Sequence, residues 1–167
     1  KWSFHRDALV MRFRELKYVK DQPALKEMVK ENCTHYLEDT ACEVHGYKIW
    51  GSPWSPWFYD WGFNLRRGPE IKAKWDLIPD ETDILITHGP PLGHGDRCEP
   101  AGNYAGCEDL LDVIQNRVKP MYNIFGHIHE GYGITTDSVT TYINASSLNE
   151  HYESVNTPVV FDLPIKK

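Results

Sequence analysis

The sequence predicts an α/β fold, because a strand, a helix and a second strand follow one another in the middle of the chain. The apolar run Ile84–Thr87 is typical of a buried strand. Apolar residues then recur every three or four positions over about Glu108–Val118, as in an amphipathic helix that ends before Pro120. The run Tyr122–Phe125 is again strand-like. Strands joined by a crossover helix are normally parallel, so we expect both to end at the same edge of one sheet.

Two elements are predicted upstream of this unit. Residues Asp21–Glu31 have a helical pattern, with Asp21 as the N-cap and Pro23 in the first turn. The segment Glu43–Trp50 places His45-Gly46 between two β-prone runs. A glycine-containing pair in that position predicts a hairpin turn.

The remaining segments complete the order. Gly51–Asn64 contains too many glycine, proline and aromatic residues for a regular element, so we expect an ordered loop. Pro69–Trp75 is predicted to be a short helix. Thr140–Asn144 and Pro158–Leu163 are expected to be two further strands, antiparallel after the chain turns at Gly131–Gly133.

Length and composition indicate one globular domain spanning residues 1–167. Hydrophobic residues make up 41% and charged residues 25% of the 167, which is within the ordinary range for a folded domain. No apolar run approaches the roughly 20 residues that cross a bilayer, so we expect no membrane partner. The net charge of −6 argues against binding to duplex nucleic acid, which normally requires a basic surface.

The four cysteines, Cys33, Cys42, Cys98 and Cys107, form no C-x-x-C pair. That spacing fits neither a zinc knuckle nor a redox dithiol. We interpret them as free thiols, which indicates a reducing compartment and a cytoplasmic location.

Three histidines follow the two central strands. His127 and His129 are two residues apart, so an extended backbone would place both rings on the same side, and His88 follows the other strand. Neutral imidazole is the commonest protein ligand for transition metals, and these rings could hold one ion or a pair. The three could also form a single site with an open position for water. The alternative is that each is a strand-end histidine hydrogen-bonded to backbone.

Several motifs carry a resemblance to a known family. Three segments resemble the C-terminal motifs of the calcineurin-like metallophosphoesterases: Thr87–Pro91, Phe125–Gly133 and Tyr142–Ser146. Pro53–Phe58 and Trp61–Leu65 narrow the match to the small metallophosphoesterase-domain-containing proteins of animals. The resemblance covers nearly the whole chain beyond about Leu25.

The resemblance implies a two-metal phosphodiesterase built as a β-sandwich flanked by helices. By the motif, His88 and His127 bind one metal and His129 the other, while a hydroxide between the ions attacks phosphorus. Paired cations neutralise the charge of the ester and lower the pKa of the attacking water. The two divalent ions would be manganese, iron or zinc, and the substrate a small phosphate ester, such as a nucleotide or cyclic nucleotide.

The chain departs from the family pattern in its upstream motifs. The family also requires an Asp-x-His, a Gly-Asp and a Gly-Asn-His before the matched part, and none is present. Gly95-Asp96 is in the wrong order, and Gly102-Asn103-Tyr104 has tyrosine in place of the general-acid histidine. We therefore expect the C-terminal portion of a metallophosphoesterase domain, with its N-terminal strands missing. Such a piece should be inactive alone, poorly stable and prone to self-association.

Other residues have two interpretations each. Asn144 and Ser146, at a strand end, could bind substrate or cap a turn, and Trp57 could stack a base or pin its loop. Glu130 could orient a ligating ring or face solvent. For the whole chain, a non-catalytic metal- or nucleotide-binding module and a mononuclear three-histidine hydrolase remain alternatives.

Overall fold

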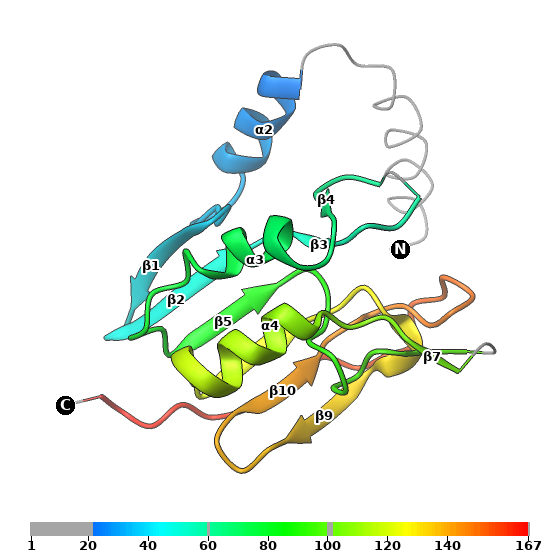
Figure 1. Cartoon of the computed structure of the whole chain (residues 1–167). Coiled ribbons are helices and arrows are strands. Elements are labelled where there is room, and N and C mark those ends of the chain that lie inside the picture. The colour runs from blue at the N-terminus through cyan, green and yellow to red at the C-terminus, as the bar shows by residue number, and fades with distance from the viewer. Residues whose placement is uncertain (1–21, 60, 100–101, 167) are drawn as a thin grey trace. The chain divides into compact units, whose positions relative to one another are not determined.

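The computed structural model describes residues 22–59, 61–99 and 102–166 (Figure 1). The chain divides after Tyr36 into two compact units, and each is described by itself. In the first unit, helix α2 (Gln22–Glu31) confirms the predicted helix, and Glu27 pairs with Lys30 on its surface. The expected N-cap, Asp21, lies outside the described residues.

The second unit is built on a mixed six-stranded sheet. Its strands are β1 (Thr40–Val44), β2 (Tyr47–Ser52), β5 (Ile84–Thr87), β8 (Tyr122–Phe125), β9 (Gly133–Thr136) and β10 (Thr141–Asn144), in the spatial order β1-β2-β5-β8-β10-β9. The four inner strands are parallel, and the two edge strands are antiparallel to their neighbours. The predicted α/β class and the parallel pairing of β5 with β8 are therefore confirmed.

The β1–β2 hairpin is also confirmed. His45 and Gly46 connect the strands with φ of 50° and 80°, so both residues are in the left-handed region. Two consecutive left-handed residues give the tight turn whose twist matches that of the paired strands. The glycine adopts this conformation without the steric cost that a Cβ would add.

Helices α3 (Pro69–Trp75) and α4 (Glu108–Val113) lie over the same face of the sheet (Figure 1). That face carries the apolar residues that the helices bury. The core residues contributed by strands are Trp50, Leu85, Phe125 and Tyr142, and those contributed by helices and their ends include Ile71, Trp75, Ile78, Leu110, Val113, Ile114 and Val118. Burial of this apolar surface is the main term that stabilises the unit.

The end of the second helix differs from the regular helix expected over Glu108–Val118. Its last turn, η1 (Ile114–Val118), is a π-helix, and Lys119 closes it by donating its N–H to the Ile114 carbonyl, 2.8 Å away. Arg117 in this turn donates to the Trp75 and Ile78 carbonyls. These bonds join the C-terminal ends of the two helices. The π-helical turn thus places Arg117 where it can donate to carbonyls that lack a partner within α3.

The aromatic segment 51–64 is largely irregular, as expected, but it begins with the last two residues of β2 and takes part in a small ribbon. Strands β3 (Ser55–Pro56) and β4 (Asn64–Leu65) pair in parallel, and a second ribbon joins β6 (Arg97–Cys98) to β7 (Asn103–Tyr104). The Asp39 carboxylate anchors the start of the segment by accepting bonds from Ser52 Oγ and Trp54 Nε1, both at 2.8 Å.

Two expectations for the C-terminal quarter are wrong. The strand expected at Thr140–Asn144 exists as β10, but it pairs in parallel with β8, and its antiparallel partner is the unforeseen β9. Pro158–Leu163 is not a strand, and Val160 is 89% exposed. A strand needs a partner edge, and this segment is instead fixed by side chains: Phe161 stacks on Tyr122, with ring centroids 4.5 Å apart.

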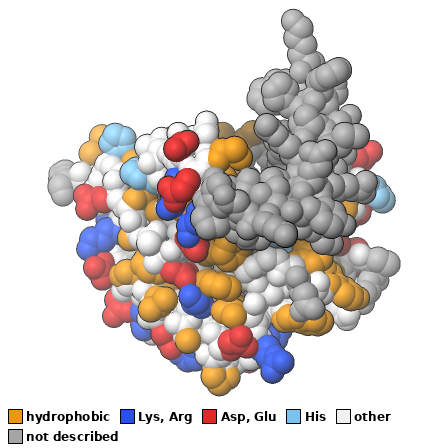
Figure 2. Space-filling model, turned by 90° about the horizontal axis from the view of Figure 1, so that it is seen from above, with side chains coloured by type: hydrophobic (Ala, Val, Ile, Leu, Met, Phe, Trp, Pro, Cys, Tyr) orange, Lys and Arg blue, Asp and Glu red, His pale blue; other side chains and the backbone are white. Residues whose placement is uncertain are grey.

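All four cysteines are free thiols, from the buried Cys107 to the exposed Cys33. Within the described ranges, every helix is too short or too polar to cross a membrane. Exposed hydrophobic side chains lie among charged ones over the surface seen from above (Figure 2).

Two neighbouring residues of β5, Leu85 and Ile86, differ in burial, and this predicts a contrast between their substitutions. Leu85 is fully buried under the helices, whereas Ile86 on the opposite face is 40% exposed. We expect Leu85→Ala to lower the free energy of unfolding by about 2–5 kcal/mol. Ile86→Ala should lower the free energy of unfolding by about 1 kcal/mol or less, because the Ile86 side chain buries less apolar surface on folding. Urea denaturation of both variants measures this, and equal losses would contradict the assigned faces.

Candidate functional site

The two central strands deliver two histidine rings to one point at the sheet edge. His88 follows the end of β5, and Gly126-His127 follows the end of β8. His88 Nε2 lies 3.1 Å from His127 Nδ1, and the ring centroids are 4.7 Å apart. The main chains are also joined there, because Gly126 N–H donates to the His88 carbonyl at 3.1 Å. The convergence expected from parallel strands is therefore present.

The backbone around this pair is tight and partly strained. His127 has φ of 72°, in the left-handed region that residues with a Cβ seldom adopt. A Cβ added at Gly126 would lie 3.3 Å from Ser146 Oγ, so a larger residue would crowd the hydroxyl. Backbone strain of this kind persists where the surroundings enforce it, and it clusters at functional sites.

Burial favours the neutral form of both rings. Desolvation lowers the pKa of His88, although this residue keeps an exposed surface. Desolvation, with smaller contributions from the charges of His88 and His129, lowers the pKa of His127 to about 4. A neutral imidazole offers a lone pair, which is the form that binds a metal.

The spacing of the two rings suits a shared metal ion. Two nitrogens bound to one zinc ion at about 2.0–2.1 Å and at a tetrahedral angle lie roughly 3.3 Å apart, close to the observed separation. The donor set is nevertheless incomplete. In residues 22–59, 61–99 and 102–166, no three histidine, cysteine, aspartate or glutamate side chains are grouped so that they could hold an ion. In the described residues the two histidines therefore meet without completing a metal site.

His129 is oriented separately, at the start of the short 3₁₀ turn η2 (His129–Gly131). Its Nδ1 lies 2.8 Å from the Asn149 carbonyl, and its ring meets the Tyr152 ring edge-on at 5.2 Å. A carbonyl only accepts, so Nδ1 carries the proton and Nε2 keeps its lone pair. Metal-binding histidines commonly have such a partner.

The sequence interpretation did not single out Asn149. Its side chain builds the turn that presents the carbonyl, because Oδ1 accepts the N–H groups of His151 and Glu153 at 3.0 and 2.9 Å. The usable signal was an asparagine in a polar stretch soon after a strand, a common sign of a turn.

The acidic residues near the histidines are engaged elsewhere. Glu130 is exposed and accepts the Glu99 N–H at 3.1 Å, which agrees with the solvent-facing alternative. Asp96 is buried, and its Oδ2 accepts the N–H groups of Gly93 and Gly106, both at 3.0 Å. This carboxylate therefore stabilises its own loop. That agrees with the sequence interpretation, in which Gly95-Asp96 is not the family's Gly-Asp motif.

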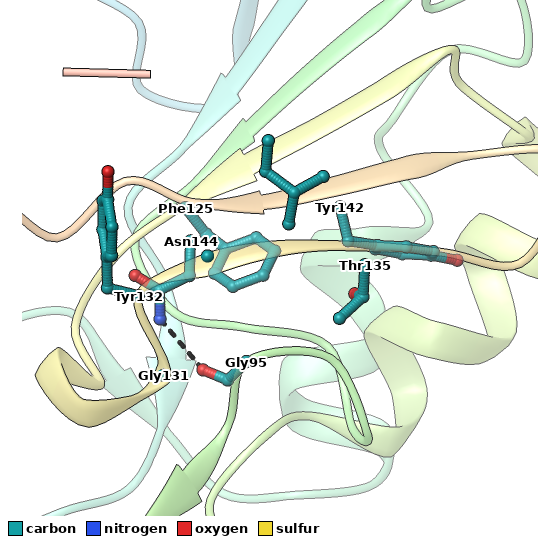
Figure 3. Close-up of a pocket in the computed structure, with 9 residues that line it drawn as sticks. Gly95, Phe125, Gly131, Tyr132, Thr135, Tyr142 and Asn144 are labelled. Atoms are coloured by element: carbon teal, nitrogen blue, oxygen red, sulfur yellow. Dashed lines mark hydrogen bonds between the residues drawn. The ribbon is translucent and has the colours of Figure 1, made fainter. Parts of the chain in front are cut away.

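Asn144 connects two loops beside a cavity of about 150 Å³ (Figure 3). Its Nδ2 donates to the Gly95 carbonyl at 2.9 Å and to the Ile128 carbonyl at 2.7 Å, and its Oδ1 accepts the Ser146 N–H at 3.0 Å. Tyr132 and Tyr142 line the same cavity (Figure 3). Asn144 thus clamps the segment between His127 and His129; a contact with substrate stays a prediction.

Ser146 and Trp57 differ in their surroundings. Ser146 is 8% exposed, and nothing among the described residues forms a hydrogen bond with its Oγ. A buried hydroxyl without a partner is costly, which makes it a good contact for a bound polar group. Trp57 is 56% exposed, and its ring lies 6.4 Å from that of Tyr59 within the aromatic segment.

Comparison with known proteins shows what the chain is similar to. No model of a protein family matches it. It is 54% identical over 133 residues, 80% of this chain and 40% of the other, to metallophosphoesterase domain-containing protein 1 of Homo sapiens. It is 50% identical over 130 residues, 78% of this chain and 33% of the other, to a UPF0046 protein of Caenorhabditis elegans. The chain therefore spans less than half the length of these relatives.

The lowered pKa of His127 predicts an acid-sensitive fold. Between pH 6.5 and about 4 the unfolded chain binds a proton at this residue that the folded chain does not. The free energy of unfolding should therefore fall as the pH is lowered through this range. His127→Asn, which tolerates the left-handed backbone, should remove part of this dependence. Urea denaturation at pH 7, 5.5 and 4.5 measures it; an unchanged pH dependence in the variant would contradict the burial of a neutral ring.

Proposed function

We propose, from the premise that this chain belongs to the family of the animal metallophosphoesterase domain-containing proteins, that it is part of a metal-dependent hydrolase of phosphate diesters. The observation that carries the proposal is the pair of neutral imidazoles, His88 and His127, whose nitrogens lie 3.1 Å apart. The left-handed backbone at His127 accompanies this pair, and backbone strain of this kind clusters at functional sites, although His45 adopts the same conformation in a hairpin turn.

Each histidine has a defined part in this proposal. His88 and His127 hold one divalent ion, and His129 offers Nε2 to a second, with its ring fixed by the Asn149 carbonyl. The metals would be manganese, iron or zinc, all of which accept imidazole. When bound, such ions neutralise the anionic ester and activate water for attack.

The other ligands and the general-acid histidine would come from sequence outside the described residues. Two divalent ions need about eight to ten donors between them, including negative charge, and the described residues supply three imidazole rings. The relatives are more than twice as long as the matched stretch, so a longer chain has room for the missing carboxylates.

The calcineurin-like sandwich belongs to the same proposal. Helices α3 and α4 cover one face of the described sheet (Figure 1). On the other face Ile86 is 40% exposed, whereas Ile84 and Ile143 are buried. A second sheet packed there would complete a sandwich and would offer a partner to the irregular segment 158–163. Where that sheet is lacking, two copies of the chain would associate around the exposed Ile86.

The substrate would be a small phosphate ester such as a nucleotide or cyclic nucleotide, met in the cytoplasm. Ser146 Oγ lies against Gly126, next to His127, and has no hydrogen-bond partner among the described residues, so it is available to a phosphate oxygen. Trp57 would stack a base, because exposed aromatic rings bind the flat faces of heterocycles. Asn144 would act by holding the turn that carries His127.

A second candidate function is a binding module that holds a metal or nucleotide without hydrolysis. The observation that bears on it is that, in the described ranges, no carboxylate is grouped with the histidine pair to complete a catalytic dinuclear centre. The two candidates differ in turnover but not in metal binding, so one experiment separates them.

The test measures metal content and hydrolysis of bis(p-nitrophenyl) phosphate together. We expect the 167-residue chain to bind metal weakly and to show no turnover. A chimaera carrying the segment of metallophosphoesterase domain-containing protein 1 that lies outside the match should bind two ions and hydrolyse the ester. His88→Asn in that chimaera should abolish turnover. Two bound ions without turnover would favour the binding module, and no metal in either protein would refute both.

Trp57 gives a separate prediction on the substrate. In the active chimaera, Trp57→Ala should raise KM for a nucleotide ester about 5- to 100-fold, the effect of losing one stacked base. The melting temperature should stay unchanged, because the side chain is 56% exposed. Trp61→Ala, at a ring that is 55% exposed in the same segment, is the matched control. An unchanged KM with a lowered melting temperature would show that Trp57 only packs its loop.

A further inference from the structure

A series of buried hydrogen bonds runs from the middle of the sheet to the turn that carries His88. Asn123, at the centre of β8, is fully buried, and Thr87, at the end of β5, is 5% exposed. Asn123 Nδ2 donates to the Leu85 carbonyl at 3.2 Å and to Thr87 Oγ1 at 3.4 Å. Thr87 Oγ1 donates in turn to the Gly89 carbonyl at 2.9 Å.

The donor and the acceptor of each hydrogen bond in this series are fixed by the chemistry of the groups. A carbonyl only accepts, so the Thr87 hydroxyl must give its proton to Gly89, and its lone pairs then face Asn123. The Leu85 carbonyl likewise requires the amide nitrogen of Asn123 rather than its oxygen. Bonds arranged in series strengthen one another, so the buried amide acts on the main chain at Gly89 through the hydroxyl.

Asn123 is an unfavourable choice for packing alone. Its neighbours in register, Leu85 and Tyr142, belong to the apolar core, and its Oδ1 has no hydrogen-bond partner in the described part of the chain. A buried amide with one unpaired atom costs stability, whereas an apolar side chain there would add to the core. A residue that breaks the local pattern without a gain in packing indicates a functional constraint.

The turn that these residues hold leads directly to the histidine pair. Gly89 follows His88, and the His88 carbonyl accepts the Gly126 N–H at 3.1 Å. A Cβ at Gly89 would lie 3.7 Å from the His127 ring. Fixing the main chain at Gly89 therefore fixes both the His88 backbone and the approach of its ring to His127.

We propose that Thr87 and Asn123 are positioning residues for the candidate metal site: their hydrogen-bonded chain holds the turn at Gly89 so that His88 meets His127. The effect on a metal ion rests on the proposed function, whereas the effect on the turn does not. Neither residue touches an ion or a substrate.

The first test follows the turn in the metal-free 167-residue protein by amide hydrogen exchange. Thr87→Val keeps the shape of the side chain and removes the hydroxyl, and Thr87→Ser keeps the hydroxyl. We expect the Gly126 amide to exchange about fivefold to tenfold faster in Thr87→Val, as for one lost buried hydrogen bond, and at the wild-type rate in Thr87→Ser. The Ala145 amide, which donates to the Phe125 carbonyl at the same edge, should be unchanged.

The second test titrates the same proteins with Co²⁺. Loss of a group that orients a ligand typically weakens metal binding 10- to 100-fold, so we expect at least about tenfold weaker binding in Thr87→Val and unchanged binding in Thr87→Ser. Should neither the wild-type protein nor the chimaera bind Co²⁺, the proposed function fails, and the exchange of Gly126 still decides the positioning role.

The positioning role is overturned by either of two results. One is that Gly126 exchanges alike in the Val and Ser variants. The other is that Gly126 and Ala145 accelerate equally, which would show global destabilisation only. Asn123→Leu provides an independent variant if Thr87→Val does not fold: it should leave the melting temperature equal or higher and still speed the exchange of Gly126.

Discussion

The parallel pairing of β5 with β8 is the constraint on which the candidate site depends. Ile86 and Ile124 are partners in that register, so the two strands end together and the segments that follow them emerge side by side. The apolar face of helix α4 packs against the strands that it connects and keeps them in this order. The 3.1 Å approach of His88 to His127 is thus a consequence of sheet geometry before it is a property of either side chain.

Several locally unfavourable features lie near the His88–His127 contact. His127 is in a left-handed conformation, Ser146 has a buried hydroxyl without a described partner, and Asn123 puts an amide into an apolar core. Each is unfavourable by itself, and together they lie on or next to the two strands that deliver the histidines. The packed core of tryptophan, isoleucine and leucine under the helices supplies the stability against which such costs are tolerated.

The proposed function gives a common reason for three features that otherwise have none. Two histidine rings meet without a third metal-ligating side chain grouped with them in the described residues, the sheet has an exposed isoleucine opposite its helices, and the segment 158–163 has β-prone residues without a strand. Metal ligands, a second sheet and a strand partner are all groups that a longer relative could contribute. A site completed by distant sequence is expected for dinuclear metal centres, since no short segment carries enough donors.

The amino-acid sequence by itself determined the elements whose signals are local: the hairpin at His45-Gly46, helix α3, and strands β5 and β8 with their parallel order. Turn residues and hydrophobic periodicity act over a few positions, and the crossover rule then brings His88 to His127. Tertiary structure decided the parallel place of β10, the irregular course of 158–163, and the Asn149 carbonyl that orients His129. These features depend on which strand edge of the sheet is unpaired and on which distant residues pack beside it. No local pattern in the sequence contains that information.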